Sequence, residues 1–307
     1  MKHIIALALA ATAAAAHATG PFAVQGQSFS SLQDAVSAIG SGAATILIAP
    51  GTYRQCAVQS AGAITYRATH PGTVVFDGAV CEGKAALVLR GQEAGVVGIS
   101  FQNMRVPDGN GAGIRLEHGN LSVSNSIFRN SEEGILTGDD PAGEIGFDHV
   151  TFSGLGRCDR GLSCAHSMYI GNYGHVTVTH SRFEAGRGGQ YFKSRAARND
   201  VTDNLFDDSH GHLTNYMIDL CAGSVGTVAR NHIIQGGDKE NHSALIAVAA
   251  ESRDHSSAGL VITNNVANYA PGPNAGQWTV FVADWSHQPL RISANSFDHR
   301  MKPFETR

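Results

Sequence analysis

The sequence predicts an all-β protein whose chain winds into a β-solenoid. One element recurs along the chain, made of an alternating strand, a polar residue and a bulky apolar anchor residue. The anchors stand 23 to 34 residues apart, a spacing at which each repeat is one turn that buries its apolar side chains only by stacking on its neighbours. No helical pattern separates the repeats. The anchors are Phe101, Phe128, Phe152, Phe183, Phe206, Ile233, Ala267 and Phe297.

The N-terminus has the features of an export signal. A short charged start at Met1 to His3 precedes an apolar, Ala-rich run from Ile4 to Ala16, and Ala16-His17-Ala18 is a small-x-small cleavage site. We therefore expect residues 1–18 to be a signal peptide and residues 19–307 to form one domain that is secreted or periplasmic. The alternative is an uncleaved anchor, but the apolar run is too short for a membrane-spanning helix.

Charge and composition exclude several partners. The formal net charge is -4, so there is no basic excess that would favour nucleic acid. No later apolar segment is long enough to cross a membrane, and no charged run suggests a membrane surface. We expect a monomer that needs no cofactor.

The first elements suit the closed end of a solenoid. Residues 31–39 are predicted to form a short helix, with Ser30 or Ser31 as its N-cap and Gly40 as its end. An apolar strand follows at residues 44–49. The helix would cover the open end of the coil, where bare strand edges invite aggregation.

An antiparallel sandwich is the competing fold. Hairpin signals of the Asn-Gly type are scarce, and the repeat persists across seven intervals, so the solenoid is favoured. The same periodicity predicts that amides two residues before the last four anchors line up as a hydrogen-bonded ladder. These residues are Asn204, Asn231, Asn265 and Asn295.

Five cysteines fit an exported protein, in which disulfides persist. Cys158 and Cys164 lie six residues apart in a polar loop, which predicts a local bridge. Cys56 and Cys81 are 25 residues apart, about one repeat, and a bridge there would tie stacked turns together and contribute roughly 3 kcal/mol. Cys221 is left over and is predicted to be a packed free thiol.

A second strand precedes the anchor strand in each repeat, and one copy carries charge. Side chains alternate between the two faces of a strand, and adjacent parallel strands are about 4.8 Å apart. Tyr169, Lys193 and Asp219 are therefore expected to form a column on three consecutive turns, with Arg195 about 7 Å along the strand from Lys193. Met217 is expected to face outward with them. The inward residues are expected to be Ile170, Phe192, Ser194, Ile218 and Leu220.

The leader, the segments Ser31–Val36 and Ile46–Tyr53, and the Asn-x-Phe-like turns together resemble the pectin-lyase-like superfamily. The resemblance covers residues 19–307. It implies a right-handed parallel β-helix that acts on an acidic polysaccharide outside the cytoplasm.

The charged column suits cleavage of a uronate polymer by β-elimination. That reaction needs neutralisation of the sugar carboxylate, a base for the C5 proton and an acid for the leaving oxygen. We expect Arg195 to bind the carboxylate, Lys193 to be the base and Tyr169 the proton donor, with His166 as the substitute in either proton transfer. The residues expected to bind substrate are Asp219, Asn172, Tyr191 and Glu251.

Lys193-Ser194 is similar to the Lys-Ser pair of β-helix alginate and chondroitin-type lyases. In that family the Lys is the base, an Arg on the next turn assists, and acidic residues before the Lys help to hold calcium. Here residues 188–191 contain no acid, and the next turn offers Asp219. No metal is therefore predicted, and calcium has no support in these residues. A plain Lys193–Asp219 ion pair on a solvated face, adding under about 1 kcal/mol, is the alternative.

Other functions remain open. A C5-epimerase would use similar proton abstraction, and a non-catalytic glycan-binding or envelope-structural β-helix would need no catalysis. A hydrolase needs two facing carboxylates, for which Asp219 and Glu251 are among the available acids. His149 and His180 occupy equivalent repeat positions, so stacking explains them at least as well as metal binding.

Overall fold

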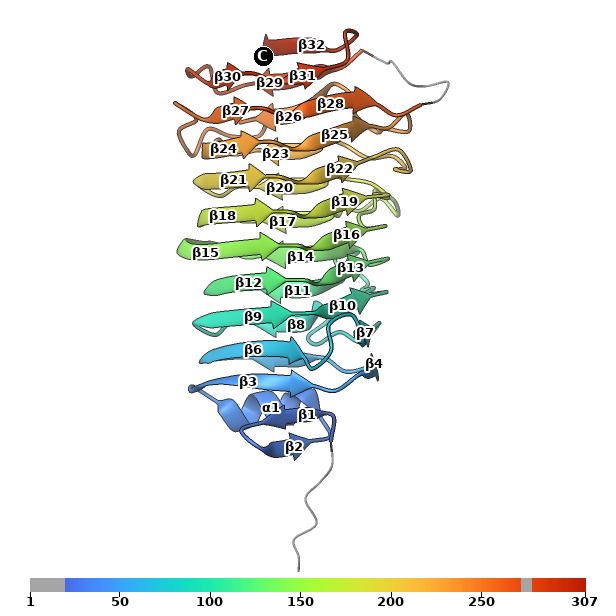
Figure 1. The fold of residues 1–307 in the computed structure, drawn as a ribbon, viewed down its shortest axis with the longest axis vertical. Helices are drawn as coiled ribbons and strands as arrows, with labels where there is room; N and C mark the ends of the chain where they lie inside the picture. The colour runs from blue at the N-terminus through green and yellow to red at the C-terminus, as the bar shows by residue number, and fades with distance from the viewer. Residues whose placement is uncertain (1–19, 272–277) are drawn as a thin grey trace, which may run out of the picture.

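The computed structural model describes residues 20–271 and 278–307. The chain is a parallel β-helix whose coils stack along one long axis (Figure 1). Three sheets, here named A, B and C, run along the stack, and each coil passes through them in that order. The predicted solenoid is confirmed. The predicted signal peptide, residues 1–18, lies outside the described residues.

Within the described residues, sheet A has 12 strands and sheets B and C have 10 each. In spatial order, sheet A contains β2 (Gln27–Phe29), β1 (Phe22–Val24), β3 (Ala43–Ile48), β6 (Ala63–Ala68), β9 (Glu93–Val97), β12 (Asn120–Ser124), β15 (Asp140–Asp148), β18 (Tyr173–Thr179), β21 (Arg198–Thr202), β24 (Val225–Ala229), β27 (Val261–Thr263) and β30 (Arg291–Ser293). Sheet B contains β4 (Gly51–Tyr53), β7 (Val74–Asp77), β10 (Ile99–Gln102), β13 (Ile127–Arg129), β16 (Thr151–Ser153), β19 (Arg182–Glu184), β22 (Leu205–Asp207), β25 (His232–Gln235), β28 (Val266–Tyr269) and β31 (Ser296–Phe297). Sheet C contains β5 (Ala57–Gln59), β8 (Ala85–Leu89), β11 (Ala112–Leu116), β14 (Glu133–Thr137), β17 (Met168–Ile170), β20 (Phe192–Ser194), β23 (Ile218–Leu220), β26 (Ala244–Val248), β29 (Val280–Asp284) and β32 (Lys302–Thr306).

The anchor residues set the register of sheet B. All eight predicted anchors pair with one another in sequence, from Phe101 to Phe297. The rings of five of them stack inside the coil, with neighbouring centroids 4.7 to 5.2 Å apart. Each stacked pair contributes about 0.5–1.5 kcal/mol beyond the burial of its surface. The stack therefore fixes which residues of successive coils lie side by side.

The predicted asparagine ladder is present beside this stack. In each pair of neighbours the Nδ2 of one Asn donates to the Oδ1 of the next, at 2.9 to 3.0 Å: Asn204 to Asn231, Asn231 to Asn265, and Asn265 to Asn295. Each Oδ1 also accepts the backbone N–H of the preceding Asn. The ladder satisfies buried amides that the turn leaves without strand partners.

Helix α1 (Leu32–Ile39) closes the N-terminal end of the coil, as predicted (Figure 1). Ser31 is its N-cap and Gly40 its C-cap. The side chain of Gln33 accepts the N–H of Val58 and donates to its carbonyl, so the helix satisfies the outermost strand of sheet C. α1 is the only helix in the described ranges, and it is too short to cross a membrane.

Both predicted disulfides are present. The Cys56–Cys81 bridge joins the segments that lead into β5 and β8, and so ties two successive coils. The Cys158–Cys164 bridge closes a loop before β17. Cys221 is a buried free thiol, and burial raises its pKa to about 12, so it is not a poised nucleophile.

Candidate functional site

The predicted column lies on the outer face of sheet C. Tyr169 of β17 pairs with Lys193 of β20, and Lys193 pairs with Asp219 of β23. Their strand neighbours Phe192 and Ile218 are fully buried in the core, so alternation directs the column away from it. The placement of this column, which the repeat predicted, is therefore confirmed.

Arg195 completes the column from the end of β20. Its backbone N–H donates to the carbonyl of Ile170 at 2.9 Å, which extends the strand pairing by one residue. Its Nε donates to the Tyr169 hydroxyl at 2.8 Å. The guanidinium thereby fixes the position of the phenol oxygen.

Glu251 joins the two cations. It follows β26 in the connection from sheet C to sheet A, where its backbone N–H donates to the carbonyl of Cys221 at 2.9 Å. One carboxylate oxygen accepts from Nζ of Lys193 and the other from Nη2 of Arg195. We call Tyr169, Lys193, Arg195, Asp219 and Glu251 the Lys193 cluster.

The cluster holds Lys193 in its charged form. Only 8% of Lys193 is exposed, and Nζ lies 5.2 Å from the centroid of the Tyr169 ring. Burial alone would lower the pKa of Lys193, but the hydrogen bond to Glu251 and the negative charges of Asp219 and Glu251 outweigh it, so the pKa is raised. The sequence predicted that Lys193 acts as the base. For this role Lys193 must lose its proton, so its contacts with Glu251 and Asp219 would have to change first.

Asp219 is the most enclosed member of the cluster, with 1% exposure. Its Oδ2 accepts from Nε2 of Gln190 at 3.1 Å, and its Oδ1 has no partner among the described residues. Burial first, and then the charge of Glu251, raise the pKa of Asp219 to about 7 against the opposing charge of Lys193. The alternative of a solvated Lys193–Asp219 ion pair is thus wrong, because Glu251 binds Lys193 and Asp219 is enclosed.

His166 lies beside the cluster but in a form that limits its chemistry. Its ring meets the Tyr169 ring edge-on with centroids 5.3 Å apart. Burial and the charge of Lys193 lower the pKa of His166 to about 3. Its Nδ1 accepts the N–H of Gln190 at 3.1 Å, so the ring is neutral with its proton on Nε2. In this form His166 is a hydrogen-bond donor at Nε2.

Two residues with predicted roles outside the coil are in the core instead: Tyr191 was expected to bind substrate and Met217 to face outward. Tyr191 is 1% exposed, and its hydroxyl donates to Asp208 at 2.7 Å. Met217 is fully buried. Both residues precede their strands, because β20 begins at Phe192 and β23 at Ile218. Strand alternation does not apply at these corners, so both side chains turn inward.

Asn172 lies in the turn after β17. Its N–H donates to Oδ1 of Asp139 at 2.7 Å, and its own Oδ1 is 3.0 Å from Nε2 of His255. Within the part of the chain that the structure describes, no hydrogen bond joins it to the Lys193 cluster.

Sequence reasoning missed Gln190, which contacts both His166 and Asp219. Its position two residues before Phe192, where strand alternation fails, gave no signal.

A metal fits the Lys193 cluster poorly. Asp219, Cys221 and Glu251 place one ligand atom each within 4.8 Å of one another. Glu251 already binds two cationic side chains, and the Cys221 thiol has its pKa raised to about 12 by burial. A metal ion would have to displace both cations and deprotonate this thiol.

A cavity of about 540 Å³ opens on the connections between sheets B and C. We call it the basic cavity, because four arginines line it: Arg105, Arg157, Arg160 and Arg187. The acids Glu132 and Asp159 also line it and pair with Arg160 and Arg157.

The other two arginines of the basic cavity bind neutral oxygens. Arg105 donates to the carbonyl of Met104, and Arg187 donates to Oδ1 of Asn130, both at 2.8 Å. Burial and the neighbouring Arg187 and Arg160 lower the pKa of Arg105. An anionic group is therefore the complementary ligand for this cavity.

No protein-family model and no curated protein matches the sequence. Among solved structures, an alginate lyase from Paenibacillus sp. str. FPU-7 has 15% sequence identity and a TM-score of 0.51, covering 89% of this chain and 94% of that one. Rice weevil pectin methyl esterase has 10% identity, a TM-score of 0.45 and coverage of 89% and 87%. An alginate lyase of the PL6 family has 15% identity, a TM-score of 0.34 and coverage of 86% and 50%. The first likeness shows the fold alone, and it agrees with the predicted parallel β-helix; the other two are too weak to support an argument.

Proposed function

We propose that the protein is a secreted enzyme that cleaves a uronate-containing polysaccharide by β-elimination at the Lys193 cluster. The observation that carries the proposal is one carboxylate held between two cations beside a phenol. Glu251 binds Lys193 and Arg195, and Arg195 also binds the Tyr169 hydroxyl. Residues 1–18 would be its signal peptide and residues 19–307 its single domain.

The Glu251 carboxylate stands in for the carboxylate of a uronic acid. Lys193 and Arg195 neutralise it in the way that β-elimination requires for the substrate, where loss of negative charge makes the C5 proton removable. Glu251 is 37% exposed at its side chain and lies on a connection between strands. A substrate carboxylate would exchange with it on the two cations.

Tyr169 is the group best placed to move protons. Its hydroxyl is fixed by Arg195 at 2.8 Å, next to the cations that would hold the sugar carboxylate. A tyrosine is able to take a proton from carbon and to protonate a leaving oxygen. Because Glu251 and Asp219 keep Lys193 charged, we assign Lys193 to carboxylate binding together with Arg195.

The basic cavity supports an acidic polymer as the substrate. The segment that leads into β20 connects the basic cavity with the Lys193 cluster, since Arg187 lines the cavity and Gln190 contacts Asp219. Arg105 and Arg187 offer guanidinium groups to a second acidic residue of a long chain. A fold shared at 15% identity with an alginate lyase does not assign a substrate, but it makes alginate the first polymer to test.

The test is incubation of residues 19–307 with a panel of uronate polymers and a neutral glucan, followed by the ultraviolet absorbance of the new double bond. We expect the absorbance to rise with at least one uronate polymer and not with the glucan. Lys193→Arg should retain more activity than Lys193→Ala if Lys193 acts as a cation, whereas a base role would abolish both. Full activity in both Lys193→Ala and Arg195→Ala would place the reaction elsewhere.

The panel also separates the other functions. Deuterium incorporation at C5 without a double bond would identify an epimerase, and tight binding without chemistry would identify a glycan-binding protein. New reducing ends without a double bond would identify a hydrolase. One observation favours this last function as the second candidate: Asp219 and Glu251 have carboxylate oxygens within 4.8 Å, with the pKa of one raised to about 7 and that of the other lowered. The enclosure of Asp219 ranks it below the lyase.

A further inference from the structure

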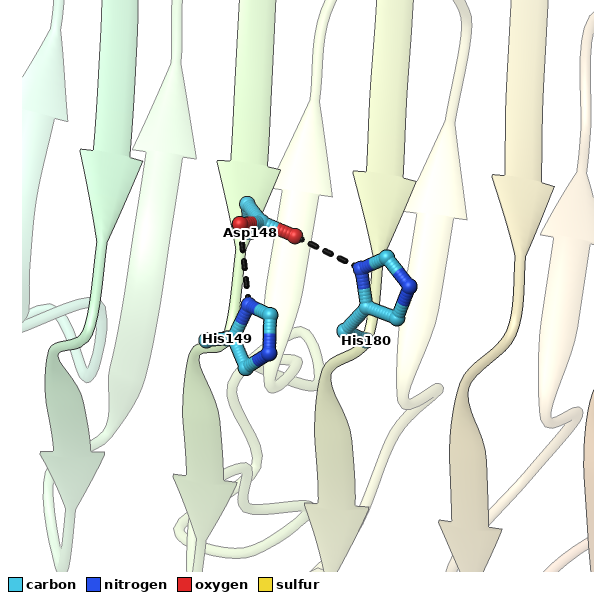
Figure 2. Close-up of side chains that lie close together, drawn as sticks. All are labelled: Asp148, His149 and His180. Carbon is cyan, nitrogen blue, oxygen red and sulfur yellow. Dashed lines mark hydrogen bonds and ion pairs between the residues drawn. The ribbon is translucent and has the colours of Figure 1, made fainter.

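A turn between sheets A and B, on two successive coils, brings together three side chains of types that can bind a metal ion. Asp148 ends β15, and His149 follows it. Asp148 pairs with Thr179, the last residue of β18, so His180 occupies the same place one coil later. Figure 2 shows the two imidazoles side by side, with one oxygen of the Asp148 carboxylate directed toward each ring.

The backbone directs both imidazoles to the same place. His149 has φ 55° and His180 has φ 48°. Both values lie in the left-handed region, which non-glycine residues adopt uncommonly. This conformation turns the chain from sheet A into sheet B and points the two side chains in parallel. The rings stack with centroids 4.9 Å apart and planes inclined by 23°.

Three possible ligand atoms converge between the two coils. Nδ1 of His149 lies 2.9 Å from one oxygen of Asp148, and Nδ1 of His180 lies 2.8 Å from the other. One ligand atom of each residue lies within 4.8 Å of the others. Thr179 donates its hydroxyl to Asp148 at 2.8 Å, which orients the carboxylate as partners of metal ligands commonly do.

We propose that Asp148, His149 and His180 bind a divalent transition-metal ion, for which Zn²⁺ is the probe. Two imidazole nitrogens and one carboxylate oxygen suit Zn²⁺, Ni²⁺ or Cu²⁺, whereas Ca²⁺ and Mg²⁺ prefer oxygen ligands only. Metal–ligand distances of about 2.0–2.2 Å in a tetrahedron separate the ligand atoms by roughly 3.4 Å. The three side chains are half exposed or more, so they reach this spacing by side-chain rotation, and water supplies the fourth ligand.

The hydrogen bonds between the two Nδ1 atoms and Asp148 do not prevent these nitrogens from binding a metal ion. Each imidazole that donates from Nδ1 to Asp148 carries its lone pair on Nε2; moving that proton to the exposed Nε2 frees Nδ1 for the metal. The ion replaces two hydrogen bonds to one carboxylate with three metal–ligand bonds. It would bridge two successive coils, and so it should also raise the unfolding temperature.

The experiment is Zn²⁺ titration calorimetry at neutral pH on the full chain without a polyhistidine tag, with melting temperature as a second readout. We expect one Zn²⁺ equivalent that His149→Ala and His180→Ala each weaken by at least about 100-fold, and that Thr179→Val weakens by about 10-fold. Zn²⁺ should raise the melting temperature of the wild type but not of the two His variants.

The matched control is His212→Ala. His212 pairs with a single carboxylate, that of Asp238, and no second imidazole among the described residues stacks on it, so this variant should bind Zn²⁺ like the wild type. All four variants change side chains that are exposed or only partly buried, and the melting temperatures without Zn²⁺ check that they fold. No Zn²⁺ binding by the wild type, unchanged binding in both His149→Ala and His180→Ala, or loss of binding in His212→Ala would each overturn the proposal.

Discussion

Replacing Asp219 with Asn should change the stability of the protein in a way that depends on pH. Asp219 is 1% exposed, and burial raises its pKa to about 7 from an ordinary value of 3.8. Because the folded-state pKa lies above the unfolded-state pKa, the native state favours the protonated carboxyl. The penalty for charging it is absent below about pH 4 and fully present above about pH 7.

The size of the effect follows from the two pKa values. Each tenfold change in proton affinity is worth about 1.4 kcal/mol, so the charged carboxylate lowers the free energy of unfolding by roughly 4 kcal/mol above pH 7. Asn keeps an oxygen that accepts from Gln190 and cannot ionise. Its extra N–H needs a partner, which costs about 1–3 kcal/mol at every pH. The change in stability between pH 4 and pH 8, rather than the value at either pH, is therefore the diagnostic quantity.

The assay is urea denaturation of wild type and Asp219→Asn at pH 4 and pH 8. The variant should gain roughly 4 kcal/mol relative to the wild type between the two. Asp203→Asn is the control, because Asp203 is partly exposed at the surface and paired with Arg230 at 2.7 Å. This variant should lose less than about 1 kcal/mol of stability, and it should lose it at high pH, where the carboxylate of the wild type is charged. If Asp219→Asn were instead most destabilised at pH 8, Asp219 would be a stabilising ion-pair partner of Lys193 and the account of its enclosure would be wrong.

Two further predictions concern the basic cavity and the core. The double variant Arg105→Ala, Arg187→Ala should raise KM for a long uronate polymer severalfold and leave kcat nearly unchanged in steady-state kinetics. The reason is that both arginines would bind the polymer away from the reacting sugar. An unchanged KM would show that the basic cavity is not part of the binding surface. Phe183→Ala should destabilise the protein by about 3–5 kcal/mol in denaturant titrations, since its ring stacks on those of both adjacent coils at 4.7 Å. The same truncation at Phe304, which is 38% exposed, should cost much less.

The fold was accessible from the sequence because its signals are local and repeated. An anchor such as Phe183 is specified by the same short pattern in every coil, and register in a parallel stack follows from aligning the copies. The pairing of Tyr169 with Lys193 and Asp219 could be predicted for that reason. The ladder that includes Asn231 follows from the same alignment.

The rest of the site depends on contacts that no repeat encodes. Glu251 lies 58 residues after Lys193 and 56 after Arg195, in a connection without a periodic pattern, so its place over the column could not be read from spacing. Glu251 is the ion-pair partner of Lys193, a contact that the spacing of the repeats does not predict. Tyr191 shows the other limit, because alternation predicts faces only within a strand, and β20 contains only three residues.

The most direct test of the proposed lyase is the rate of double-bond formation by Tyr169→Phe on a uronate polymer that the wild type cleaves. The substitution removes one hydroxyl and keeps the ring beside Lys193 and Arg195. A group that transfers protons typically contributes 100- to 10,000-fold to a rate, so kcat should fall by about 100-fold or more while the polymer still binds. Wild-type protein that forms no double bond with any uronate polymer, or a Tyr169→Phe variant with an unchanged rate, would contradict the account.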